Sequence, residues 1–152
     1  MVTDLPTLEN LRQSWHTVRV TQAMIQANTA PLIFSMVPAA TGFARLPESL
    51  LLVFGVSVLE DALRQICDEG AFSSKRKQLG SLMEASRSVV PWKNFDAVHQ
   101  IRERRNGIAH DRAFLAADQC SIDLDTLAVE LIAWGVLEHD YADTYKIEFR
   151  PS

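Results

Sequence analysis

The chain has 152 residues, of which 47% are hydrophobic and 22% are charged, a balance typical of one soluble globular domain with a substantial core. Its net charge of −4 and its pI near 5.5 argue against a general nucleic-acid coat protein, which would be basic. We therefore predict a single domain over residues 1–152.

The start of the chain shows neither the basic residues nor the apolar run of a signal peptide. The longest apolar run, residues 50–59, ends at Glu60 and Asp61 and is too short to span a bilayer. Cys67 and Cys120 are too few for a disulfide framework and lack metal-ligand spacing. These features predict a cytoplasmic protein with no membrane segment, no metal and no cofactor.

The first two predicted helices follow apolar residues at three- and four-residue steps. The first covers about residues 7–28, and prolines then break an apolar stretch over 31–47, which is typical of a packed connector. The second covers about 47–69, with Pro47 at its start and Gly70 at its end. Because its first half is apolar nearly all round, we expect it to be the central helix or part of an oligomer interface.

Three more helices are predicted in the second half of the chain. The third covers about residues 75–89, the fourth 94–111 and the fifth 124–138, with Ser121 or Asp123 as the N-cap of the fifth. Together the elements predict an all-α, up-and-down bundle of about five helices.

The end of the chain, residues 144–150, alternates apolar and polar side chains with a period of two, which predicts a short C-terminal strand. A lone strand needs a partner, for which the same segment of a second subunit is one source. A frayed tail is the alternative interpretation.

The fourth predicted helix carries the most informative stretch of the chain, in which Arg105 and Asn106 are followed after three residues by His110. Histidine, with an unperturbed pKa of about 6.5, gives and takes protons at working pH. An arginine fork stays charged and grips phosphate oxygens through two N–H groups. Metal-free RNA cleavage needs both functions: proton transfer at the 2′-hydroxyl or the leaving oxygen, and a fixed cation for the charge that builds on the phosphate.

Helical spacing places Arg105 on an apolar stripe with Val98 and Ile101. Because an unpaired cation there is unfavourable, we expect Glu60 or Asp61 of the second helix to hold the guanidinium.

The same spacing lets Asn106 hydrogen-bond His110, four residues later, and set its orientation. Arg105 and His110 lie five residues apart, roughly 140° around a regular helix, so one copy is poorly arranged to surround one phosphate. Two copies facing each other would form a composite cleft with two arginines and two histidines.

The Arg-Asn-x-x-x-His string resembles the signature of HEPN domains, small helical bundles many of which are RNases. The resemblance implies a metal-independent endoribonuclease, with its site between paired domains of a homodimer and the 2′-hydroxyl of the RNA as nucleophile. His110 would act as general base or acid, Arg105 would stabilise the transition state, and Asn106 would orient the pair. The matching helix of HEPN domains often carries a polar or acidic residue, which favours Glu60 over Asp61 as the support of Arg105.

Arginines around the motif predict further RNA contacts, at Arg102, Arg104 and Arg112. Some toxin-type HEPN proteins carry a tyrosine two residues after the histidine, where a partner nucleotidyltransferase modifies it. Arg112 stands at that position, so we do not expect such a partner.

The family resemblance implies a prokaryotic toxin or antiviral defence system as the setting, with an antitoxin or defence-system protein as a possible partner. The alternative hypothesis is a non-catalytic HEPN module that binds RNA, a nucleotide or a protein partner. A structural helical protein without a site is a third interpretation.

Overall fold

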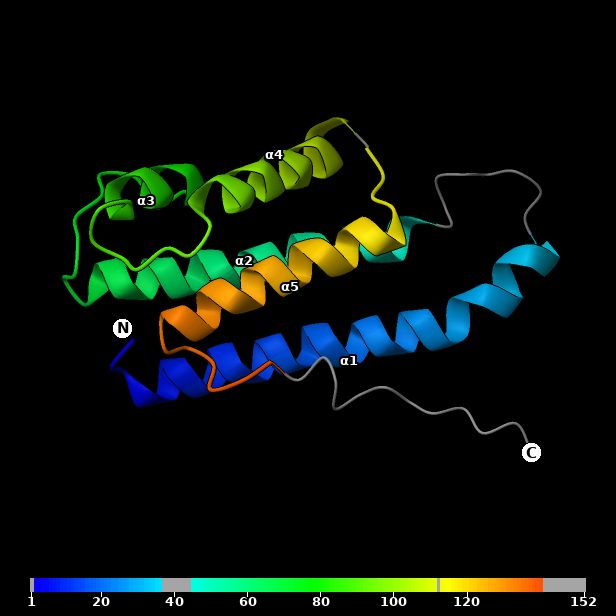
Figure 1. Cartoon of the computed structure of the whole chain (residues 1–152), viewed down its shortest axis with the longest axis horizontal. Coiled ribbons are helices and arrows are strands. Elements are labelled where there is room, and N and C mark those ends of the chain that lie inside the picture. The colour runs from blue at the N-terminus through cyan, green and yellow to red at the C-terminus, as the bar shows by residue number, and fades with distance from the viewer. Residues whose placement is uncertain (1, 37–44, 112, 141–152) are drawn as a thin grey trace.

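The computed structural model describes residues 2–36, 45–111 and 113–140, and within these ranges the regular secondary structure is entirely helical. Four long helices alternate in direction along the bundle, and a short helix lies beside one end (Figure 1). The all-α, up-and-down prediction is confirmed for the described residues. In chain order the helices are α1 (Leu5–Met36), α2 (Leu46–Asp68), α3 (Leu79–Ser86), α4 (Phe95–Asp111) and α5 (Ala117–Ala133).

The central position of α2 follows from its apolar surface. It packs against each of the other four helices, and the predicted central role of this segment is confirmed. Gly55 marks the close approach of α5, because a Cβ there would stand 2.7 Å from the Cδ2 atom of Leu124. The apolar side chains of α2 with no exposed surface are Leu52, Leu59, Ala62 and Leu63.

Glycine ends α2 as the sequence predicts. Gly70 adopts a φ of +85°, a left-handed conformation that side chains disfavour. The N–H group of Ala71 then donates to the carbonyl of Ile66 over 3.2 Å, which closes the last turn in a Schellman motif. Gly135, with a φ of +72°, follows α5 in the same way.

The first helix is longer than predicted. Its helical residues continue through Pro31 to Met36, so the connector predicted over residues 31–47 is wrong in its first part. A proline removes one backbone hydrogen bond from a helix but leaves the turns on both sides intact. Residues 37–44 of that connector lie outside the described residues, as do residues 144–150, for which a strand was predicted.

The third and fifth helices have different starts from those predicted. Helix α3 begins at Leu79 rather than near residue 75, and α5 begins at Ala117, seven residues before the expected start. The predicted caps Ser121 and Asp123 therefore lie inside α5. Asp123 is 1% exposed and faces α4, so tertiary packing rather than capping explains its polar side chain.

A buried carboxylate of α5 fixes the start of α4. Glu130 is fully buried and accepts backbone hydrogen bonds from Lys93 over 2.9 Å and from Asn94 over 2.6 Å. The side chain of Asn94 in turn accepts from the N–H group of Ala97 over 3.1 Å and caps α4. Two neighbouring contacts thus determine where the motif-bearing helix begins.

A second buried charge joins α1 to the middle of α5 and to the segment that follows it. Arg19 is 2% exposed, donates to Asp125 over 2.7 Å and also pairs with Asp140.

None of the described helices combines the length and apolar content that a membrane span requires.

Candidate functional site

The residues of the Arg-Asn-x-x-x-His string lie in the second half of α4. Val98 and Ile101 are buried against the core, and Arg105 follows one turn later as a half-buried side chain. The predicted placement of Arg105 beside the apolar stripe is therefore confirmed. His110 lies in the last turn of the helix and is exposed.

A pocket of about 540 Å³ opens along this face of α4. It is bounded by α4, by Glu60 of α2, and by Gln78 and the first turn of α3. One chain thus brings Arg105 and His110 to the same pocket despite their angular separation on the helix. The lining residues are Glu60, Gln78, Leu79, Gly80, Ser81, Arg102, Arg105, Asn106 and His110.

The hydrogen-bond donors of the Arg105 side chain are only partly paired within the protein. Its Nη1 atom donates to the side-chain oxygen of Asn106 over 3.3 Å. Its Nε atom is buried and has no hydrogen-bond partner among the described residues. A buried donor without a partner is unfavourable for folding.

The predicted support of Arg105 by an acidic residue of α2 is wrong. Glu60 accepts from Arg64 over 3.0 Å, and Asp61 accepts from the same guanidinium over 2.5 Å. Arg64 is one helical turn away on the same helix, so this pairing needs little ordering of the side chains. Glu60 still lines the pocket, opposite the arginines of α4.

Asn106 has a different partner from the one predicted. Its side-chain oxygen accepts from Arg105 rather than fixing His110. The amide therefore orients the arginine fork, and His110 projects from the end of α4 at the edge of the pocket.

Arg102 is the second arginine of the pocket. It lies three residues before Arg105 on the same face of α4, and its side chain is 23% exposed. Its guanidinium donates to Glu103, and this hydrogen bond lowers the pKa of the Glu103 carboxyl. This position is compatible with the RNA contact predicted for Arg102, which stays a prediction.

Arg104 has a structural contact instead of a place in the pocket. It grips Asp123 of α5 through two hydrogen bonds, of 2.8 and 2.6 Å, and Gln119 donates to the same carboxylate. Its predicted role in RNA binding is not supported by this arrangement, because a buried carboxylate occupies the arginine fork. Arg112, the third predicted contact, lies outside the described residues.

No protein-family model, curated protein or solved structure matches the chain. The resemblance to HEPN domains therefore rests on the motif, and the pocket is the physical basis for assigning its residues a function.

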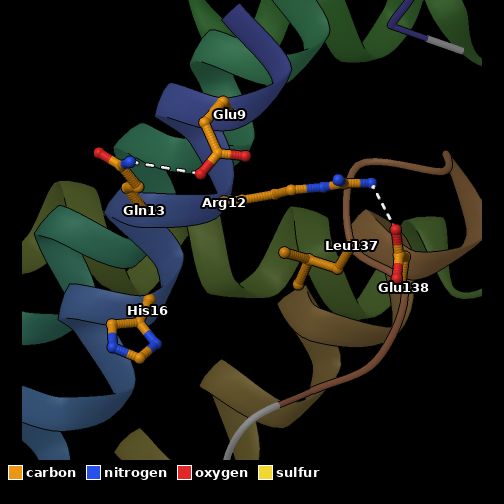
Figure 2. A pocket seen from close by; sticks show the side chains of 6 residues that line it. All are labelled: Glu9, Arg12, Gln13, His16, Leu137 and Glu138. Atoms are coloured by element: carbon orange, nitrogen blue, oxygen red, sulfur yellow. Dashed lines mark hydrogen bonds and ion pairs between the residues drawn. The ribbon is translucent and has the colours of Figure 1, made fainter. Parts of the chain in front are cut away.

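A second pocket, of about 340 Å³, lies between α1 and the segment after α5 (Figure 2). Its charged side chains are largely engaged in ion pairs and hydrogen bonds within the protein. Arg12 donates to the carbonyl of Val136 over 2.9 Å and pairs with Glu138 over 3.3 Å, so less of its fork is free for an anion. The residues that line this pocket are Glu9, Arg12, Gln13, His16, Leu137 and Glu138.

Other reactive groups offer little chemistry. Burial, followed by the nearby Glu48 carboxylate, raises the pKa of the Cys120 thiol to about 12, so the thiol stays protonated and is a poor nucleophile. Within the described residues, no three His, Cys, Asp or Glu side chains form a group that could hold a metal ion.

Sequence reasoning missed the wall that α3 contributes. Gln78, Gly80 and Ser81 line the pocket, although this segment was expected to be an ordinary stretch of helix. Its residue types carry no functional signal. A glycine early in a helix was the one available hint, because glycine marks places where another group approaches the backbone closely.

Proposed function

We propose that the chain is a metal-independent endoribonuclease of the HEPN type. The observation that supports this most is the gathering of Arg102, Arg105, Asn106 and His110 on one pocket. Two guanidinium groups provide an anion-binding environment, and the exposed histidine at its edge provides a group for proton transfer. We infer a cytoplasmic protein of a prokaryotic toxin or antiviral defence system, with an antitoxin or defence protein as partner.

In the proposed reaction the substrate's own 2′-hydroxyl attacks the adjacent phosphorus. His110 takes the hydroxyl proton as general base or returns a proton to the 5′-oxygen as general acid. Arg105, oriented by Asn106, stabilises the charge on the phosphorane-like transition state. The bond between phosphorus and the 5′-oxygen breaks, which leaves a 2′,3′-cyclic phosphate and a 5′-hydroxyl.

The product ends provide the direct test. Purified protein incubated with labelled single-stranded RNA should generate 2′,3′-cyclic phosphate and 5′-hydroxyl ends, and cleavage should persist in EDTA. DNA, or RNA with a 2′-O-methyl group at the cut site, should resist because the nucleophile is missing or blocked. Products with 5′-phosphate ends would contradict the mechanism. RNA binding without cleavage would favour the non-catalytic HEPN module.

We also propose a homodimer, because the reaction needs both a base and an acid and the pocket of one chain is lined by a single histidine among the described residues. An exposed apolar stripe on α2, consisting of Leu46, Leu50 and Phe54 at four-residue steps, supports this proposal. These side chains are 37%, 56% and 44% exposed. Such a stripe is a candidate contact between two copies.

Light scattering at micromolar concentration should give twice the 17.0 kDa mass of one chain. Replacing Leu50 and Phe54 by Glu should convert the protein to a monomer without unfolding it, since both side chains are already exposed. A monomeric wild-type protein that cleaves RNA would contradict the dimer and leave the chemistry to one chain.

A further inference from the structure

Gly80 and Arg102 meet at the wall of the pocket. A Cβ atom built at Gly80 would stand 2.3 Å from Nη1 of Arg102 and 3.3 Å from its Cζ atom, far closer than two such atoms can approach. Backbone conformation does not explain this glycine, because among the described residues positive φ values occur at Gly70 and Gly135. The guanidinium of Arg102 therefore occupies the space that any other residue at position 80 would fill.

The two arginines of the pocket are held separately. Arg105 is oriented by Asn106, whereas Arg102 lies over Gly80 and pairs with the exposed carboxylate of Glu103. Side chains three residues apart on a helix are neighbours, so the two forks lie beside each other without sharing a partner. Glu103 is 56% exposed, and a phosphate can replace such a solvent-accessible partner at little cost.

We propose that Arg102, seated over Gly80, forms a second phosphate subsite beside Arg105 and His110, and that Gly80 fixes its position. The pocket would then bind an RNA segment through two consecutive phosphates, one at the reacting centre and one at Arg102. This inference rests on the proposed function. It adds that the substrate is at least a trinucleotide, and that a residue of α3 helps to determine its binding.

The test compares two uncleavable probes by NMR titration: a 2′-O-methyl uridine dimer with one phosphate, and the corresponding trimer with two. The wild-type protein should bind the trimer about tenfold more tightly than the dimer, because the second phosphate adds one charge-assisted hydrogen bond. Arg102→Gln should abolish this preference, lowering the affinity for the trimer much more than the affinity for the dimer. It should also reduce the salt dependence of trimer binding, with a slope of log K against log salt smaller by about 0.7.

Gly80→Ala is a more specific test than Arg102→Gln, because it displaces the guanidinium without removing it. The group that must move is the far end of a flexible side chain, so the melting temperature should stay close to wild type while the guanidinium is displaced. Trimer affinity should fall by roughly 3- to 10-fold, and Gly80→Ala should add nothing in an Arg102→Gln background. Gly107→Ala is the matched control. A Cβ at this position would make an ordinary 3.6 Å contact with Ala113, and Gly107 does not line the pocket.

The outcomes separate the inference from the proposed function. Equal affinity for the two probes, or additive losses in the double variant, would overturn the second subsite even if the wild-type protein cleaves RNA. The expected binding pattern without any cleavage would support the subsite and refute the endoribonuclease. Failure to bind either probe, together with failure to cleave RNA, would refute both.

Discussion

Replacing His110 by Ala should lower the rate of RNA cleavage by about 10²–10⁴-fold, the usual contribution of a general acid or base. The melting temperature should change little, because His110 is exposed in the last turn of α4 and the core does not depend on it. RNA affinity should also remain near wild type, since the two arginines are retained. The measurement is the single-turnover cleavage rate on labelled RNA, with a thermal melt of the same preparation.

His99 provides the matched control for this variant. It lies on the same helix, three turns earlier, and does not line the pocket. His99→Ala should therefore cleave RNA at the wild-type rate. Undiminished cleavage by His110→Ala would indicate that another group transfers the proton, or that the activity comes from a contaminating nuclease.

Replacing Arg105 by Met should remove activity to a similar extent and leave the fold at least as stable. The guanidinium provides the transition-state contact, yet its Nε atom is buried without a hydrogen-bond partner. Met keeps an unbranched apolar stem in that place and removes the unsatisfied donor. A gain of about 1 kcal/mol in the free energy of unfolding is expected, a rise in melting temperature of roughly 2–4 °C. Arg105→Lys should rescue little activity, because it loses the planar fork.

Arg104→Met is the contrasting control, since it changes the neighbouring arginine in the same way. Loss of the Arg104 guanidinium would leave the buried carboxylate of Asp123 without its cation and lower the free energy of unfolding by about 3–5 kcal/mol. The two variants should therefore shift the melting temperature in opposite directions. A fall in the melting temperature of Arg105→Met comparable to that of Arg104→Met would show that Arg105 is a structural residue, and would weaken its assignment to the reaction.

Local patterns were enough to predict much of the bundle. The apolar periodicity of residues 47–69 predicted α2 to within one residue at each end, and Gly70 predicted its stop. The spacing on α4 also predicted that Arg105 lies against the apolar stripe. These features depend on helix geometry alone, in which residues three or four apart share a face whatever packs against them.

Ion-pair partners and the far wall of the pocket required the tertiary structure. Spacing left Glu60 and Asp61 as candidate partners of Arg105, whereas both pair with Arg64 of their own helix. Packing of α4 against α5 pairs Arg104 with the buried Asp123. Gly80 enters the site from α3, a helix distant in sequence from the motif. Partner choice depends on which charges burial brings together and how much water it removes from them, and neither quantity is encoded in the spacing of residues along one helix.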